Sequence, residues 1–332
     1  MQLDSVRELK DAIRRKAMEL IARAAGIGRD IALPAQPLRE IEPTQRTVAL
    51  GIAPGTSRDF RLAVRIQRRG LEGSRQLERI RAMAKGEVDV RYIGRLVKRA
   101  PPWHQRRNRP LRVGGSVGHF AITAGTLGGF VTRRRDGAVL ILSNNHVLAN
   151  ENRAVAGDAI LQPGRFDGGR RPVDRVGDLA AFVRLQRTRV NLVDAAVAEV
   201  RSGIAYDAAR LTGIGKLAGL GPAVLDDSAP VAKVGRTTGV TRGRVTAFEL
   251  DNVVVAYDGG NLRFDDQIEI EGAGDRGFSD GGDSGSLIVN ADRLAVALLF
   301  AGGDQGGSNG RGLTYANPLA TVLERLKVDL LF

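Results

Sequence analysis

From about Gly114 to the last residue, short apolar runs rich in Val, Leu and Ile alternate with stretches of Gly, Asp, Asn and Arg. Most of these runs are too short for a helix, and most of the chain's 42 glycines fall in this part. Such a pattern is typical of many short strands joined by tight turns, as in an all-β sandwich or barrel. Helical spacing of apolar residues at 317–330 predicts one closing helix.

The residues before Gly114 follow a different pattern. Apolar positions spaced as on one face of a helix occur at 3–25, and Pro34, Pro37 and Pro43 then indicate a linker. After the prolines, alternation predicts strands, with one helical stretch between them. The expected elements are strands at 48–52 and 60–66, a helix at 74–85 and a strand at 88–92. This β-β-α-β order predicts a small α+β domain, half of a ferredoxin-like fold.

Charge separates the same two parts of the chain. Residues 1–113 contain 26 Lys and Arg against 12 Asp and Glu, whereas residues 114–332 are nearly neutral. The Pro- and Arg-rich stretch 98–112 has the composition of a linker between domains. We therefore expect a basic amino-terminal module at 1–113 and a β domain at 114–332. The module's charge fits a well-solvated surface; nucleic acid, an acidic protein or anionic lipid is the alternative, although no nucleic-acid motif accompanies it.

Several functional classes are excluded by what the sequence lacks. The chain has no cysteine, which excludes disulfides, thiolate metal sites and cysteine nucleophiles. No signal-peptide pattern, membrane-spanning run, Walker-type phosphate loop or metal-ligand cluster is visible. We therefore expect a cytoplasmic protein that needs no cofactor and no metal and does not enter a membrane.

The strongest candidate for chemistry is the string FSDGGDSGSLIV at 278–289. A serine hydroxyl is a weak nucleophile at neutral pH and needs both a base and a site that stabilises an anion. Glycines in a Gly-Asp-Ser-Gly turn let the N–H groups of Gly282 and Ser284 converge on one point. Ser284 is therefore the candidate nucleophile; a surface turn with an incidental serine is the alternative.

The base for such a serine is expected to be a histidine, and the chain has three. His104 lies in the expected linker and His119 at the edge of the β domain. His146 directly follows an apolar strand in VLILSNNHVLA, residues 139–149, which favours a position at a strand end facing a cleft. We expect His146 to be the base, rather than a core or capping histidine.

A carboxylate must then orient the imidazole. The apolar string NLVDAAVA, residues 191–198, is expected to be a strand with Asp194 inside it, where an unpaired acid would be costly. Asp178, in VGDLA at 176–180, is the rival candidate. We favour Asp194.

Taken together, the order His–Asp–Ser and the strings SNNHVL, VDAAV and GDSGS resemble the trypsin-like, chymotrypsin-fold serine peptidases. TAGTLGGF at 123–130 is similar to the opening strand of that family, and VGRTTGVTRGRV at 234–245 to a second-barrel segment of its cysteine-free bacterial members. The serine string is also similar to that of the plant narrow-leaf proteins, which are intracellular trypsin-like peptidases. The resemblance covers residues 114–332 and implies a mainly β, double β-barrel domain with a carboxy-terminal helix.

The resemblance also implies a mechanism and a substrate class. His146, Asp194 and Ser284 would form the catalytic triad, and the amides of Gly282 and Ser284 the oxyanion hole, for hydrolysis of peptide bonds in proteins or peptides through an acyl-enzyme. By position, Phe278, Ser279, Gly302 and Gly312 would form the specificity pocket. Because Phe278 stands where an acid would select basic side chains, we expect apolar or small side chains to be preferred over Lys and Arg.

Other aspects are open at this stage. No activation cleavage site is recognisable, so Asp283 is expected to pair with an arginine or with backbone amides rather than with a new amino terminus. Residues 1–113 could inhibit the β domain, stabilise it, or serve as a module for recruitment or assembly. The protein could also form a homo-oligomer. The rival function is a catalytically silent barrel scaffold whose basic module binds an acidic partner or nucleic acid.

Overall fold

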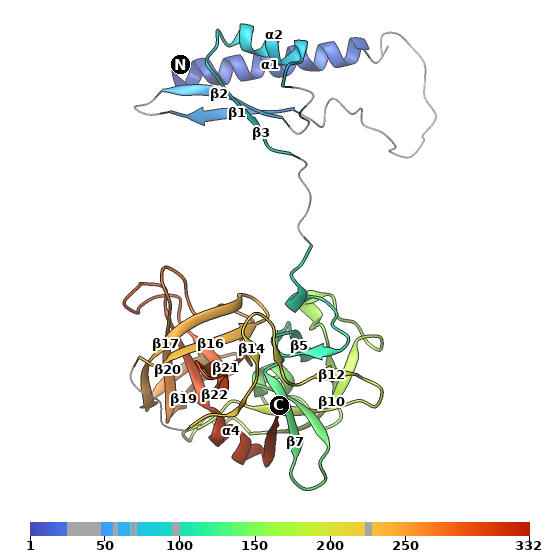
Figure 1. Ribbon diagram of the computed structural model, residues 1–332, viewed down its shortest axis with the longest axis vertical. Coiled ribbons are helices and arrows are strands. Elements are labelled where there is room, and N and C mark those ends of the chain that lie inside the picture. The colour runs from blue at the N-terminus through green and yellow to red at the C-terminus, as the bar shows by residue number, and fades with distance from the viewer. Residues whose placement is uncertain (25–47, 56–58, 67–68, 70–71, 95–99, 223–227) are drawn as a thin grey trace. The chain divides into compact units, whose positions relative to one another are not determined.

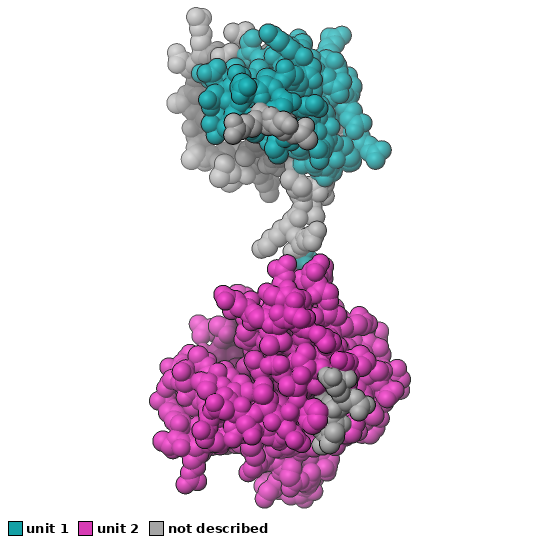
Figure 2. Space-filling model, turned by 90° about the vertical axis from the view of Figure 1, so that its left-hand side faces the viewer, with its two compact units in different colours: residues 1–100 teal, residues 101–332 magenta. Residues whose placement is uncertain are grey.

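The computed structural model describes residues 1–24, 48–55, 59–66, 69, 72–94, 100–222 and 228–332. It divides into two compact units, Met1–Ala100 and Pro101–Phe332, which are ribbon-drawn in Figure 1 and coloured separately in Figure 2. The linker expected from Pro34, Pro37 and Pro43 lies outside the described residues.

The first unit has two helices and a three-stranded sheet. Its elements are α1 (Leu3–Ala24), β1 (Val48–Pro54), β2 (Phe60–Ile66), α2 (Arg75–Met83) and β3 (Val88–Tyr92). Strand β2 lies in the centre, antiparallel to β1 and parallel to β3. Alternation along β2 buries Leu62, Val64 and Ile66 against Ile13 of α1 and Leu77 of α2. The described part therefore matches the expected element order, with a basic α+β unit preceding the β domain.

The second unit begins with an eight-stranded sheet that curls on itself (Figure 1). The strands run in the order β24-β7-β8-β11-β10-β9-β5-β6. Strand β8 contains the apolar string Val-Leu-Ile-Leu; Leu140, Ile141 and Leu142 pack into the core, and β7 and β11 flank the strand on either side. The elements of this part are β4 (Leu111–Arg112), β5 (Ser116–His119), β6 (Gly125–Thr126), β7 (Gly129–Arg133), β8 (Val139–Ser143), α3 (Asn145–Leu148), β9 (Ala159–Leu161), β10 (Arg175–Phe182), β11 (Ala196–Val200) and β12 (Tyr206–Asp207).

The rest of the second unit contains a closed barrel. Strand β22 pairs with both β21 and β23, so the order β22-β21-β16-β17-β20-β23 returns to its start. The elements are β13 (Arg210–Leu211), β14 (Gly215–Lys216), β15 (Gly219–Leu220), β16 (Pro230–Gly235), β17 (Gly239–Leu250), β18 (Val253–Tyr257), β19 (Gly260–Phe264), β20 (Gln267–Gly272), β21 (Leu287–Asn290), β22 (Leu294–Gly302), β23 (Leu313–Pro318), α4 (Leu319–Leu326) and β24 (Val328–Leu331). Strands β18 and β19 form a separate hairpin. The predicted chymotrypsin-like double barrel with a carboxy-terminal helix is confirmed.

The closing helix is shorter than the sequence predicts. Helix α4 ends at Leu326 because Lys327 has a φ of 54°, a left-handed conformation that stops the helix. The chain then continues as β24, whose Val328 is fully buried and which pairs with β7 of the first sheet. The apolar residues after Lys327 therefore belong to a strand, which the helical spacing did not reveal.

The stretch 101–112, expected to belong to a linker, is part of the second unit. Leu111 is fully buried, and β4 pairs with β12. The Nδ1 atom of His104 lies 2.6 Å from the carbonyl oxygen of Arg236. Proline and arginine content indicated a linker here, but the few apolar residues between them pack into the core.

Candidate active site

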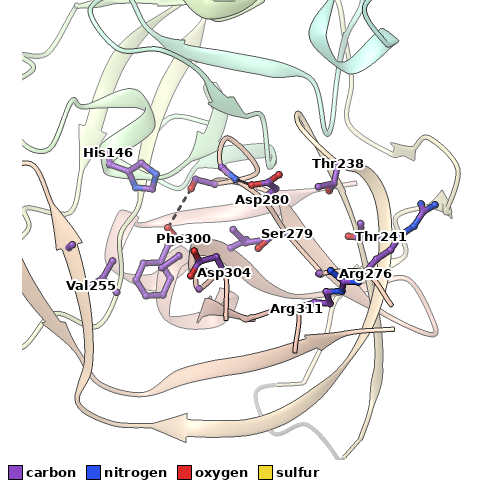
Figure 3. A pocket seen from close by; sticks show the side chains of 18 of the residues that line it. His146, Thr238, Thr241, Val255, Arg276, Ser279, Asp280, Phe300, Asp304 and Arg311 are labelled. Atoms are coloured by element: carbon purple, nitrogen blue, oxygen red, sulfur yellow. Dashed lines mark hydrogen bonds between the residues drawn. The ribbon is translucent and has the colours of Figure 1, made fainter. Parts of the chain in front are cut away.

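The curled eight-stranded sheet forms the first barrel of the second unit, and the closed sheet forms the second barrel. A cleft of about 1010 Å³ is lined by residues of both barrels. His146 lines it from the first sheet, and Ser284, Ser279 and Gly302 line it from the second barrel. Figure 3 shows His146 at one end of this cleft, with Arg276 and Arg311 toward the other end. Two of the three expected catalytic side chains therefore share one solvent-accessible space.

His146 is positioned by a short helix at the end of a buried strand. Strand β8 ends at Ser143, and α3 starts at Asn145, so the imidazole leaves the chain where the barrel wall ends. The flanking residues Asn145, Val147 and Leu148 are buried and hold the turn of helix in place. The end of the continuous apolar run at Ser143 therefore places the histidine at the cleft.

Asp194 is fully buried beside this helix and accepts hydrogen bonds on both carboxylate oxygens. Its Oδ2 lies 2.5 Å from Nδ1 of His146, and its Oδ1 accepts from the backbone amides of Asn145 at 2.6 Å and His146 at 3.3 Å. These bonds explain how an acid is tolerated in an apolar string. The rival Asp178 is paired with Arg175 at 2.6 Å instead.

The pKa of His146 is set by two opposing effects. Burial alone would lower it, but the charge of Asp194 and the hydrogen bond that the imidazole donates to that carboxylate outweigh burial, so the pKa is raised above its usual 6.5. With Nδ1 facing Asp194, Nε2 is the ring nitrogen available to a reacting group.

Ser284 lies at the start of a turn after the string Asp-Gly-Gly-Asp. Its Oγ lies 3.4 Å from the carbonyl oxygen of Phe300, drawn as the dashed line in Figure 3. No hydrogen bond joins Ser284 to His146 in the described part of the chain. Such bonds are often long or absent without substrate and tighten when substrate binds.

The backbone around Ser284 offers donors to an anion. Across the described residues, the amides of Gly282 and Ser284 donate no hydrogen bond, whereas the intervening Asp283 amide donates to the carbonyl of Asp280. Gly282 has a φ of +95°, and a Cβ there would lie 2.6 Å from Oγ1 of Thr237. A glycine is therefore required for this backbone path.

Asp283 is fully buried and paired with Lys233, which is also fully buried. Nζ of Lys233 lies 3.0 Å from Oδ2 of Asp283, and Thr237 and Thr238 donate their backbone amides to Oδ1. The expected backbone amides are present, but the cation is a lysine rather than an arginine. Lys233 was missed, although a lysine in the alternating strand Val-Ala-Lys-Val is a signal that could have revealed it.

The four expected pocket residues occupy different places. Ser279 and Gly302 line the cleft, where Oγ of Ser279 lies 2.7 Å from Oγ1 of Thr314. Phe278 is buried in the core of the second barrel, and Gly312 is a buried residue directly before β23 with a φ of +83°. Neither of these two lines the cleft.

One further residue of the site has no signal in the sequence. Tyr257, at the end of β18, donates its hydroxyl to Oδ2 of Asp194 at 2.7 Å, from 63 residues away in the chain. Its ring meets the imidazole of His146 edge-on, with 6.0 Å between centroids.

The described residues hold neither a metal-ligand cluster nor a membrane-spanning helix. They contain no group of three or more acidic or histidine side chains placed to hold a metal ion. Among them, no helix combines the length and apolarity needed to cross a bilayer.

Comparison with known proteins gives matches by structure only. Neither a protein family nor a curated protein matches the chain by sequence. Among solved structures, it resembles Thermobifida fusca protease A (16% identity, TM-score 0.46) and Cellulomonas bogoriensis chymotrypsin (18%, 0.45), each over 67% of this chain and 98% of the other. A glutamic acid-specific serine protease matches with 20% identity and a TM-score of 0.48, over 67% of this chain and all of the other. At these values no function transfers, and the likeness to the plant narrow-leaf proteins stays a prediction.

Proposed function

We propose that the chain is a serine endopeptidase that hydrolyses peptide bonds through an acyl-enzyme on Ser284. The observation that carries the proposal is the fully buried Asp194 carboxylate at 2.5 Å from Nδ1 of His146, with Ser284 in the same cleft. A buried acid, an imidazole and a serine with two unoccupied amides are the groups that acyl transfer requires.

In the first half of the reaction, Nε2 of His146 takes the proton of Ser284 as Oγ attacks the substrate carbonyl carbon. The amides of Gly282 and Ser284 stabilise the oxyanion of the tetrahedral intermediate. His146 then donates its proton to the leaving amine, the C–N bond breaks, and an ester remains on Ser284.

In the second half, His146 takes a proton from water, and the resulting hydroxide attacks the ester carbonyl. The bond to Oγ breaks, the proton returns to Ser284 from His146, and the carboxylic acid product leaves. Asp194 stays ionised throughout, because it orients the imidazole and stabilises the imidazolium that forms twice in each cycle.

For the side chain before the cleaved bond, we propose a preference for apolar or small groups over Lys and Arg. At this part of the cleft wall, the hydroxyls of Ser279 and Thr314 form a hydrogen bond with each other. The groups at this position are therefore neutral hydroxyls and not a carboxylate that would select Lys or Arg. Arg242, Arg276 and Arg311 also line the cleft and disfavour a basic side chain, although four acids, Glu151, Asp275, Asp280 and Asp304, line it as well. Profiling with a peptide library tests this, and a strong preference for Lys or Arg would overturn it.

A fluorophosphonate probe tests the proposed function directly, because it labels only an activated serine. We expect the protein to be labelled and Ser284→Ala to lose the label. Ser202→Ala is the matched control, since Ser202 is exposed in a loop of the first barrel, and it should label normally.

The main alternative is a silent barrel scaffold with a basic module that binds an acidic partner or nucleic acid. A folded protein that never reacts with the probe, under any condition, would favour that alternative. Cleavage of casein by the protein and not by Ser284→Ala would favour the peptidase and identify proteins as substrates.

A further inference from the structure

We infer that Tyr257 is a positioning residue of the triad, which sets the proton affinity of His146 through its hydroxyl bond to Asp194. The inference rests on the proposed function for its meaning in catalysis. Its physical basis is a contact between described side chains: the phenol oxygen lies 2.7 Å from Oδ2 of Asp194, the same oxygen that faces His146 at 2.5 Å.

Sharing of one oxygen is what couples the two residues. Oδ1 of Asp194 is already occupied by the amides of Asn145 and His146, so Oδ2 carries the charge that the imidazolium uses. A phenol that donates to Oδ2 withdraws part of this charge. The imidazolium is therefore less stabilised when the phenol is present than when it is absent.

The phenol keeps its proton and can act only as a donor here. Burial raises the pKa of Tyr257 well above 10, and the charge of Asp194 raises it further. The hydroxyl therefore remains a donor to Asp194 over the whole range in which His146 titrates.

The hairpin that carries Tyr257 is fixed to the first barrel at both ends. At its tip, the amide of Asp258 donates to Oε1 of Glu151 at 3.2 Å, and Arg153 pairs with Asp258 at 3.1 Å. At its base, the amide of Asn191 donates to the carbonyl of Arg263 at 2.9 Å. These contacts hold the hairpin, and with it the phenol, against the part of the first barrel that carries Asp194.

Other charges near His146 must be considered in any titration. Glu151 raises the pKa of His146 through its charge, and Asp280 lies across the cleft. Both are unchanged by loss of the Tyr257 hydroxyl, so a change in the pKa of His146 reports on the shared oxygen of Asp194.

The experiment is a ¹⁵N NMR titration of the histidines in the full chain. The chain has three, and His104 and His119 serve as internal references because they contact Arg236 and Asp158 instead. In Tyr257→Phe we expect the pKa of His146 to rise by roughly one unit, a tenfold increase in proton affinity. The matched control is Tyr315→Phe, which removes a phenol hydroxyl whose pKa is raised by burial and by the charge of Glu269 and which makes no hydrogen bond to Asp194. An unchanged pKa of His146 in folded Tyr257→Phe would overturn the inference.

A second measurement covers the case in which Tyr257→Phe does not fold. Biosynthetic replacement of all four tyrosines by 3-fluorotyrosine makes the phenol a stronger donor without removing it. The pKa of His146 should then fall, and no shift would contradict the inference. Because the readout is a titration, it is separate from the proposed function: absence of fluorophosphonate labelling removes the peptidase proposal, whereas the NMR result decides the role of Tyr257.

Discussion

Lys233 and Asp283 form an ion pair, 3.0 Å long, in which neither side chain is exposed to solvent. Asp283 directly precedes Ser284 in the chain. Its carboxylate also accepts hydrogen bonds from the backbone amides of Thr237 and Thr238. A cation supplied from strand β16 therefore fixes the turn that presents the nucleophile and the two amides. No cleavage of the chain is needed to create this partner for Asp283.

We predict that Lys233→Met destabilises the protein by about 3–5 kcal/mol, because it leaves the Asp283 carboxylate buried without its cation. Fluorophosphonate labelling should fall even at temperatures where the variant is folded, since the turn at Ser284 loses its support. Denaturant unfolding and labelling measure the two effects. Lys216→Met is the control, because Lys216 is exposed. Full stability and labelling of Lys233→Met would contradict the role assigned to the pair.

We predict that Gly282→Ala reduces kcat/KM by about 100- to 1,000-fold, the cost of displacing one oxyanion donor. The backbone has a φ of +95°, and the added methyl would crowd Thr237 and Arg236 at 2.6 and 2.8 Å. Gly281→Ala is a matched control one residue earlier, because a Cβ there meets nothing within 4 Å. Rates for a chromogenic peptide ester would compare the two, and equal activity would argue against the oxyanion hole at Gly282.

We predict that kcat/KM rises with pH through a midpoint above 6.5. Only the neutral imidazole can accept the proton of Ser284, and the pKa of His146 is raised because the charge of Asp194 outweighs burial. In Asp194→Asn the charge is lost while burial remains, so the residual activity should have its midpoint below 6.5. Asp178→Asn should leave the profile unchanged, as Asp178 pairs with Arg175. A wild-type midpoint at or below 6.5 would refute this account.

Site residues that are positioned by their own sequence neighbours could be predicted, whereas those positioned by distant parts of the chain could not. The double barrel and the positions of His146, Asp194 and Ser284 could be predicted, because each residue stands in a short string that also encodes its own strand end or turn. Tyr257 could not, since its partner is 63 residues away and its hairpin has no distinctive string. The placement of Phe278 in the core also depends on barrel closure, which pairs strands that the sequence does not show to be neighbours.

The second unit begins at Pro101. The sequence placed the boundary near residue 113, but residues 101–113 belong to the second unit. Leu111 and Val113 are buried in its core, and the amide of Asn108 donates to Oε1 of Gln162 at 2.9 Å. A chain starting at Gly114 loses these contacts and two buried aliphatic side chains, of which Leu111 alone is worth about 2–5 kcal/mol.

We therefore expect a chain starting at Pro101 to have a higher melting temperature than one starting at Gly114. A truncation at Gly114 removes the first unit and also destabilises the second. Its effect on labelling therefore cannot be assigned to loss of inhibition alone. The fair comparison is between the full chain and residues 101–332, with the rate of fluorophosphonate labelling as the readout. Faster labelling of the shorter chain would indicate inhibition by the first unit, and equal labelling would exclude it. Equal melting temperatures of the two truncations would show that residues 101–113 are dispensable for the fold.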